Sequence, residues 1–294
     1  RFKRLIRLCS FRIYDYFCNM IFYFSGTGNS HWAAELLGQS LNERIVSIRE
    51  IVGVNTSFTL EKGEKVGFVF PVHGWRVPRI VMEFMRTLEL HEADLQNNIG
   101  HYTFCLVTAG DTIGRTMERF VKLVKDVKSE TPLTLNAVEA VIMPESYVGL
   151  PGMDVDKPEK EREKIEIAEK IISNFSSVVK DQKVSQSNLP LGWEHLKRGP
   201  IPDFFSGPVG AFFTYVLVTD KPFRVESEKC VQCGICAKVC PVSDIDGGKG
   251  KEPKWRNNGK CLTCFACYHH CPQHAIEYGR RTKYKGQYFF RKRN

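Results

Sequence analysis

Eight of the eleven cysteines lie in two copies of one pattern near the C-terminal end of the chain. Each copy reads Cys-x2-Cys-x2-Cys-x3-Cys-Pro, and the second copy begins 31 residues after the first. Three thiolates at this spacing can converge on one compact inorganic cluster, whereas the fourth follows a helical step and binds the other cluster. The spacing therefore predicts two iron–sulfur clusters whose ligands are exchanged between the copies.

Each predicted [4Fe-4S] cluster takes four cysteine ligands. The first cysteine set consists of Cys230, Cys233, Cys236 and Cys271. The second cysteine set consists of Cys261, Cys264, Cys267 and Cys240. Pro241 and Pro272 follow the last cysteine of each copy, where their fixed φ ends the local turn.

Zinc and disulfide bonds are the alternatives for so many cysteines. A structural zinc site usually takes two separate Cys-x2-Cys pairs, and the third cysteine and the Cys-Pro of each copy argue against it. Disulfides form in oxidising compartments, and the sequence shows no signal peptide. Iron–sulfur clusters are therefore the favoured interpretation.

Residues 223–285 resemble the bacterial-type ferredoxins that hold two clusters, through this repeated pattern. One difference is the long connection between Cys240 and Cys261, which is rich in Gly and Lys. We interpret it as a surface loop insertion that leaves the ligands unchanged. Short segments are expected to open and close the unit, at 223–225 and 276–278.

A second stretch with chemical potential lies near the start of the chain. Met20 to Phe24 is a continuous apolar run, which is typical of a parallel strand buried on both faces. A loop of Gly, Ser, Thr and Asn follows at 25–30, and a helical pattern containing Ala33 and Leu37 comes next. Strand, loop and helix in this order present backbone N–H groups and hydroxyls to a phosphate.

The loop lacks the residues of the common nucleotide-binding motifs. It has no Gly-Lys-Ser/Thr, and the third glycine of the dinucleotide fingerprint is missing. A hydroxyl-rich loop without a cation resembles the phosphate loop of flavodoxins, and an ordinary turn is the alternative. The resemblance implies that the FMN phosphate is held by Ser25, Thr27, Gly28, Asn29 and Ser30.

Four more strand-like runs follow, most of them separated by helical patterns, at 44–48, 65–70, 102–108 and 137–143. This alternation favours a parallel α/β sheet, and right-handed crossovers leave few topologies. The stretch 49–64 is a weak helix candidate, so one crossover is expected to be irregular. We expect a flavodoxin-like, doubly wound five-stranded sheet of order 2-1-3-4-5, followed by a small α+β ferredoxin domain.

Two more loops, 71–78 and 108–114, fall at the same edge of the predicted sheet. In flavodoxin-like proteins such loops flank the isoalloxazine ring, and an aromatic side chain stacks on it. His73 or Trp75 could stack here, or could be a turn residue and a loop-filling aromatic, and Tyr147 is a further candidate. The contacts implied by the resemblance are Val72, His73, Gly74, Trp75, Ala109, Gly110 and Asp111.

Length and composition fit a two-domain protein without a membrane span. The chain has 294 residues, 43% of them hydrophobic, and no apolar run of 18 residues. Cys105 lies in an apolar run and is expected in the core. The net charge of +9 is concentrated at the ends, +4 in 1–19 and +7 in 280–294. Basic ends can touch nucleic acid or lipid, but solvated tails are commoner, so nucleic acid is not the expected partner.

The predicted organisation has five parts: a basic extension 1–19, an FMN-binding domain 20–180, a connector 181–222, a ferredoxin domain 223–285 and a basic tail 286–294. The extension is interpreted as sequence outside the folded unit, with a membrane-surface helix or a targeting segment as alternatives. The connector is rich in aromatic residues, which predicts an ordered segment that packs the domains together.

Over residues 20–285 the chain resembles fusions of a flavodoxin-like domain with a two-cluster ferredoxin, found among anaerobic microbes. The resemblance implies a cytoplasmic electron-transfer protein that relays electrons between FMN and two [4Fe-4S] clusters and serves redox partner proteins. One alternative is a reductase with a small-molecule substrate, so enzymatic activity stays open. Another is a regulatory protein that uses its clusters as a redox sensor.

Overall fold

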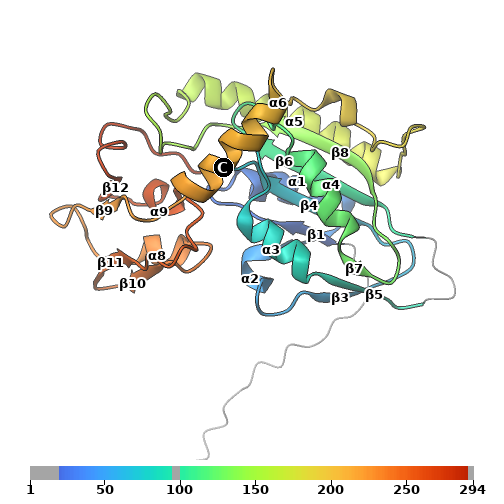
Figure 1. Cartoon of the computed structure of the whole chain (residues 1–294), viewed down its shortest axis with the longest axis horizontal. Helices are drawn as coiled ribbons and strands as arrows, with labels where there is room; N and C mark the ends of the chain where they lie inside the picture. Colours follow the sequence, from blue (N-terminus) through green and yellow to red (C-terminus); the bar gives the residue numbers. More distant parts are fainter. Residues whose placement is uncertain (1–19, 95–99, 291–294) are drawn as a thin grey trace, which may run out of the picture.

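A five-stranded parallel sheet forms the centre of the larger part of the molecule (Figure 1). The computed structural model describes residues 20–94 and 100–290, so the expectations for 1–19 and 291–294 lie outside the described residues. The strand order is β2-β1-β4-β6-β8, which confirms the predicted flavodoxin-like order. The strands are β1 (Met20–Tyr23), β2 (Arg44–Ser47), β4 (Val66–Pro71), β6 (Thr103–Ala109) and β8 (Leu135–Ile142).

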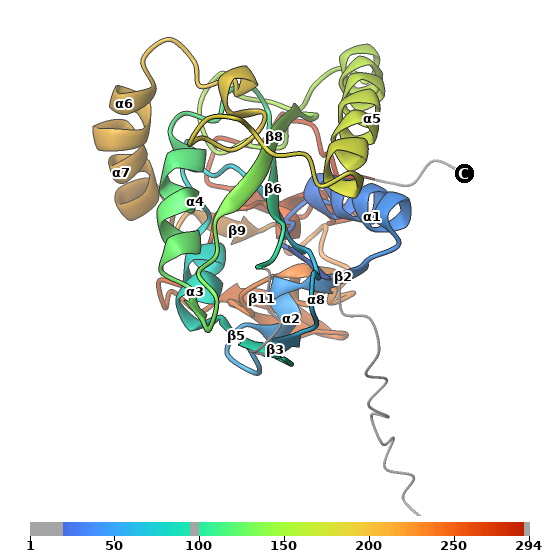
Figure 2. The same ribbon diagram turned by 90° about the vertical axis from the view of Figure 1, so that its right-hand side faces the viewer.

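Helices cover both faces of this sheet (Figure 2). One face carries α1 (Asn29–Leu41) and α5 (Pro158–Lys180), and the other carries α3 (Arg79–Thr87) and α4 (Thr116–Lys125). Side chains alternate between the two faces along each strand. Phe22 of β1 points to one face and packs on Phe84 of α3, whereas Phe104 of β6 points to the other face and packs on Phe175 of α5. Because both faces are covered, the central strands read as continuous apolar runs. Cys105 is fully buried in this core.

A small second sheet was not predicted. The stretch between β2 and β4 contains a single helical turn, α2 (Ile48–Ile51), and then β3 (Ser57–Leu60). Strand β3 pairs in parallel with β5 (Glu89–Glu92), which in turn pairs with β7 (Lys128–Ser129). These strands are short and rich in polar residues, so they carry no clear periodic signal.

The C-terminal part is a small ferredoxin-like α+β unit that lies beside the sheet (Figure 1). Strand β9 (Phe223–Val225) pairs antiparallel with β12 (Ile276–Tyr278), and the short helices are α8 (Ile235–Val239) and α9 (Ala266–His269). The connection between the cysteine copies was expected to be a surface loop. It is instead a hairpin of β10 (Ile245–Gly248) and β11 (Lys251–Trp255).

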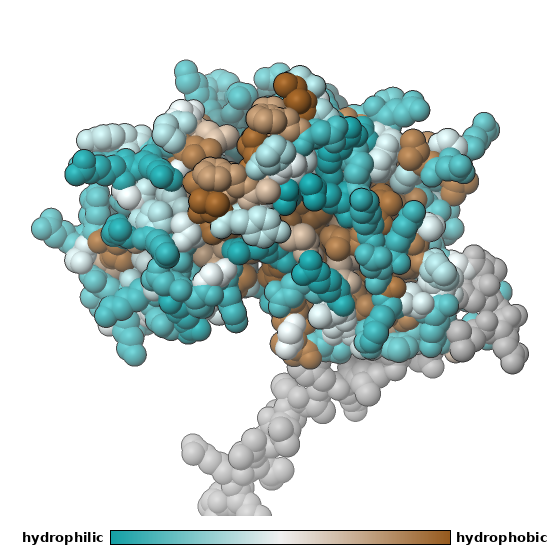
Figure 3. All heavy atoms as spheres, viewed as in Figure 1, coloured by the Kyte–Doolittle hydropathy of each residue, from teal (hydrophilic) through white to brown (hydrophobic). Residues whose placement is uncertain are grey.

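The connector is ordered and contacts both parts. It contains a 3₁₀ turn at Trp193–His195 and an irregular helix formed by α6 (Pro202–Phe204), η2 (Phe205–Val209), α7 (Gly210–Phe212) and η3 (Phe213–Leu217). The Arg76 guanidinium donates hydrogen bonds to the carbonyls of Ser206 and Gly207, while the Tyr278 hydroxyl donates to that of Leu217. Hydrophobic residues of this helix reach the surface (Figure 3), notably Phe204, Phe212, Tyr215 and Val216, as does the preceding Ile201. Within 20–94 and 100–290, no helix combines the length and apolar character needed to cross a bilayer.

Gly67 provides a test of the packing of the central sheet. A Cβ at this position would lie 2.4 Å from the Phe104 ring, so Gly67→Ala should lower the free energy of unfolding by about 1–3 kcal/mol. Urea unfolding measures the loss. Combining the change with Phe104→Leu should recover part of it, because the smaller side chain vacates the contact. If the stability losses of the two single variants simply added in the double variant, this packing would be contradicted.

Candidate functional site

A cavity of about 320 Å³ opens at the carboxyl ends of β1, β4, β6 and β8. We call it the carboxyl-edge cavity. Eleven of the predicted flavin contacts line it: Ser25, Thr27, Asn29, Ser30, Val72, His73, Gly74, Trp75, Ala109, Gly110 and Asp111. Gly28 is not among the lining residues, because the Phe290 N–H donates to the Thr27 carbonyl and the Phe290 Cβ covers the Gly28 Cα.

The cavity is polar where α1 begins. Within the described chain, no side chain caps α1 and no acidic residue lies in its first turn, so its first N–H groups remain available to an anion. Hydroxyls surround them: Thr27 Oγ1 donates to Ser146 Oγ at 3.2 Å, and Ser30 Oγ lies 2.8 Å from Thr108 Oγ1. An uncapped helix start among hydroxyls suits a phosphate group.

The Asn29 side chain forms hydrogen bonds to two other segments of the protein. Its Nδ2 donates to the Pro144 carbonyl at 3.0 Å, and its Oδ1 accepts a 2.6 Å hydrogen bond from the Tyr288 hydroxyl. The side chain therefore joins the loop after β8 to the C-terminal segment. Only its backbone N–H is placed to serve the helix start.

The opposite end of the cavity is aromatic. Trp75 Nε1 donates to Thr112 Oγ1 at 3.2 Å, and its ring packs 4.8 Å from that of Phe205 in the connector. The His73 ring meets Phe24 edge-on at 6.0 Å. Burial, with a smaller contribution from the Arg79 charge, lowers the pKa of His73 to about 4, so this ring is neutral at neutral pH. Stacking of either ring on a flavin stays a prediction.

Several lining residues were not among the predicted contacts. They come from the loop after β8, from the connector and from the second cysteine copy: Met143, Pro144, Glu145, Ser146, Leu150, Met153, Val209, Phe212, Phe213, Leu217, Leu262, Thr263 and Cys264. The aromatic content of the connector was a usable signal for Phe212 and Phe213. Nothing in the local sequence indicates that Cys264 reaches this cavity.

Two charged side chains fix the loops after β6 and β8. The Lys164 ammonium donates to the carbonyls of Gly110 and Met143 and pairs with Asp156 at 2.6 Å. Glu145 accepts hydrogen bonds from the N–H groups of the next two residues, and burial raises its pKa. The Lys164 contacts hold both loops against α5, while Glu145 braces its own loop.

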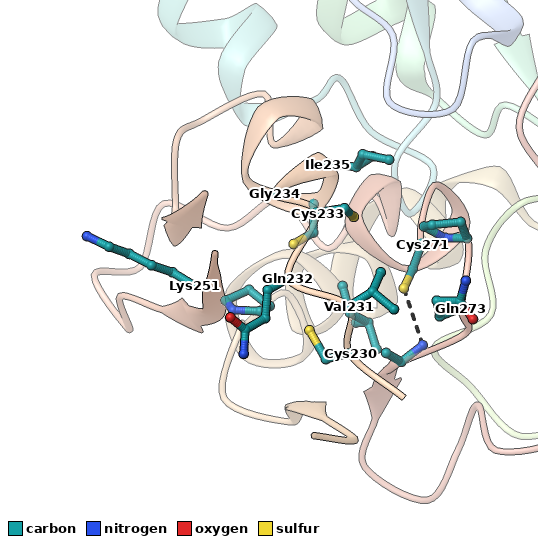
Figure 4. A pocket seen from close by; sticks show the side chains of 14 residues that line it. Cys230, Val231, Gln232, Cys233, Gly234, Ile235, Lys251, Cys271 and Gln273 are labelled. Carbon is teal, nitrogen blue, oxygen red and sulfur yellow. Dashed lines mark hydrogen bonds between the residues drawn. The ribbon is translucent and has the colours of Figure 1, made fainter. Parts of the chain in front are cut away.

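The eight cysteines of the repeat line two small cavities. One is lined by Cys230, Cys233, Cys236 and Cys271, and Figure 4 shows Cys230, Cys233 and Cys271 around it. The other is lined by Cys240, Cys261, Cys264 and Cys267. These groups coincide with the first and second cysteine sets. Iron ligation itself stays a prediction.

Helix geometry explains the exchange between the copies. Cys236 lies in α8 and Cys240 directly follows it, so four residues at about 1.5 Å each carry the last sulfur about 6 Å along the axis into the other cavity. Cys267 likewise lies in α9, and Cys271 follows two residues after the end of that helix. The copies also share positive φ values at equivalent positions, with Gln232 and Gly234 matching Thr263 and Phe265.

Backbone hydrogen bonds to two of the sulfurs favour their charged form, whereas burial of other cysteines opposes it. Backbone N–H groups of Ala275 and Asp244 donate to the sulfurs of Cys271 and Cys240, each at 3.2 Å. Burial raises the pKa of the free Cys264 thiol to about 12, so binding a metal would release its proton. Within the described ranges, no group of three or more His, Cys, Asp or Glu side chains could hold a single metal ion.

Cys264 lines both the carboxyl-edge cavity and the cavity of the second cysteine set. A Cβ on Gly26, in the loop after β1, would lie 3.0 Å from the Cys264 Cβ, so the two backbones approach closely. The Arg79 guanidinium donates to the Cys261 carbonyl, and His269 Nε2 lies 2.6 Å from the Ser146 carbonyl oxygen. The second set is therefore held directly against the cavity.

Comparisons with known proteins identify an iron–sulfur domain at the C-terminal end. Residues 223–272 match the family model of the 4Fe-4S dicluster domain. Among solved structures, the chain is similar to a candidate flavoprotein from Bacteroides eggerthii, at 16% identity and a TM-score of 0.24, covering 41% of this chain and 84% of that one. At that TM-score the similarity carries no argument, and the fold rests on the strand order. No curated protein matches the chain.

Pairs of cysteine substitutions test whether the fourth cysteine of each copy binds the cluster of the other copy or the cluster of its own copy. Cys233→Ala with Cys271→Ala removes two ligands of one set, so about four of about eight irons should remain after anaerobic purification. Cys261→Ala with Cys271→Ala changes one copy but both sets, and nearly all iron should be lost. Iron and sulfide analysis measures both, with circular dichroism as a control for folding. The reverse pattern would show that each copy binds its own cluster.

Proposed function

We propose that this protein transfers electrons between FMN in the carboxyl-edge cavity and two [4Fe-4S] clusters held by the two cysteine sets. One observation carries the proposal: Cys264 lines both the carboxyl-edge cavity and the cavity of the second set. A cofactor in the first cavity and a cluster in the second would then be separated by little more than one side chain. Electron transfer needs such a short and fixed gap.

The residues of the carboxyl-edge cavity fit a flavin mononucleotide. The cavity has a volume of about 320 Å³, which lies within the range of small-molecule sites. The hydroxyls of Ser25 and Thr27 and the start of α1 would hold the phosphate, while Trp75 and Phe213 supply apolar walls for the ring. A bound flavin would supply one-electron and two-electron chemistry. The neutral His73 adds no positive charge beside it.

The cysteine sets likewise fit iron–sulfur clusters. Each set brings four thiols around one cavity and includes sulfurs that accept backbone N–H hydrogen bonds. Such hydrogen bonds, together with burial, tune the reduction potential of a cluster. The second set is the more enclosed one, since Cys240 and Cys267 are buried while Cys233 of the first set is exposed. The chain thus offers a buried inner site and an open outer site.

Anaerobic purification with cofactor counting tests this function directly. We expect about eight irons and about one FMN per chain. The oxidised protein would then be mixed rapidly with a limiting amount of dithionite. The absorbance of the clusters and that of the flavin should decrease with shared rate constants. Iron without flavin would refute the FMN assignment. Both cofactors without mutual exchange of electrons would refute the relay.

Flavin selectivity tests the predicted phosphate contacts. Ser25→Ala with Thr27→Val removes hydroxyls that would bind an anion, so FMN should bind about tenfold or more weakly. Riboflavin has no phosphate, so its affinity should change much less. Fluorescence titration of the deflavinated protein measures both affinities, with Ser187→Ala on an exposed loop as the control. An equal loss for both flavins would mean that the change only deforms the loop.

A reductase that acts on a small molecule is the second candidate function. Connector residues Val209, Phe212, Phe213 and Leu217 line the carboxyl-edge cavity, as a substrate site over the flavin would require. Phe212 is about half exposed, so it stands at the opening. Flavin-dependent turnover of a small electron acceptor that falls in Phe212→Ala, with unchanged flavin content, would favour this function over pure electron transfer.

A further inference from the structure

The first cysteine set forms the outer end of the relay. Its cavity shares no lining residue with the carboxyl-edge cavity, whereas the cavity of the second set shares Cys264. Cys233 is exposed, and the neighbouring Val231 is 60% exposed. A second protein can therefore approach the first set more closely than the second.

The hairpin β10–β11 lies against this outer end. The Gly250 N–H donates to the Gln232 carbonyl at 2.8 Å. A Cβ on Gly234 would lie 2.7 Å from the Gly248 carbonyl carbon, so only a glycine lets the two loops meet this closely. The hairpin turn is therefore fixed beside Cys233 by contacts that involve the cysteine loop itself.

The hairpin places positive charge beside the exposed cysteine. Lys249 and Lys251 are exposed at its turn, and Lys251 lines the cavity of the first set while its side chain extends outward (Figure 4). Lys229, which precedes Cys230, is also exposed, but its ammonium pairs with Glu226 at 2.5 Å. The hairpin turn 248–251 contains no acidic residue, Glu252 follows it, and 223–290 holds twelve Lys and Arg against six Asp and Glu. Basic side chains thus border the apolar Val231.

We propose that Lys249, Lys251 and Val231 form a docking surface for a small acidic electron-carrier protein. The inference rests on the proposed function. One electron would pass between the two proteins in each encounter, one being oxidised and the other reduced, with no bond formed or broken. Charge complementarity would steer the encounter, and the apolar centre would exclude water. A second copy of this chain fits poorly, since its net charge is +9.

Stopped-flow mixing of the dithionite-reduced holoprotein with an acidic rubredoxin as the probe tests the proposal. The second-order rate of rubredoxin reduction should fall with rising salt. Lys249→Glu with Lys251→Glu should lower the low-salt rate by about tenfold or more. With a basic cytochrome c as the probe, the same variant should react faster.

A matched control separates local docking from total charge. Lys170→Glu with Lys180→Glu changes two exposed lysines of α5 and alters the net charge equally, so its effect on rubredoxin should be small. Equal effects of the two variants would overturn the proposal, as would a hairpin variant that reacts normally. Duplex DNA binding that is lost in the hairpin variant without a change in rubredoxin rate would identify nucleic acid instead. Iron content and internal electron transfer, measured first, show separately whether the proposed function fails.

Discussion

The close approach of Gly26 to Cys264 is the contact on which the rest of the arrangement depends. It brings a loop at the carboxyl end of β1 against a sulfur of the second cysteine set. Residue 26 carries no side chain, and any Cβ there would have to displace its neighbour. The interface around the contact is polar and specific, with Arg79 on the Cys261 carbonyl and His269 beside the Ser146 carbonyl. These hydrogen bonds fix the distance between the two cavities.

The C-terminal segment strengthens this arrangement. After the last strand of the ferredoxin-like unit, the chain returns to the start of α1, where Tyr288 bonds to Asn29 and Phe290 stacks on Trp32 at 4.9 Å. Lys285 donates to the carbonyls of Val148 and Leu150 on the way. The two parts are thus joined at both sides of the carboxyl-edge cavity. Their relative position does not depend on the connector alone.

The two cysteine copies are similar in backbone but different in surroundings. Gly234 and Phe265 occupy equivalent positions with positive φ, which costs a non-glycine residue roughly 1–2 kcal/mol. Phe265 offsets this cost because its ring is buried against Phe223 and Tyr278. The glycine of the first copy instead lets the hairpin approach. One repeated backbone therefore serves an enclosed inner site and an open outer site.

The sequence by itself determined the features that depend on local spacing. Cysteine spacing predicted the two sets that line the cavities, and the alternation of apolar runs predicted a parallel α/β sheet, because helix and strand periods leave a direct pattern in the chain. The strand order came from the resemblance to flavodoxins. The hydroxyl-rich loop was located from the local order of an apolar strand, a polar loop and a helical pattern.

Only the tertiary structure decided which distant segments meet. It placed Cys264 at the carboxyl-edge cavity, covered Gly28 with the C-terminal segment and turned the Asn29 side chain toward the loop after β8. It also formed the small sheet from polar strands and the β10–β11 hairpin from a presumed loop. Such contacts arise from packing and backbone hydrogen bonding between segments, which leave no periodic signal in either segment.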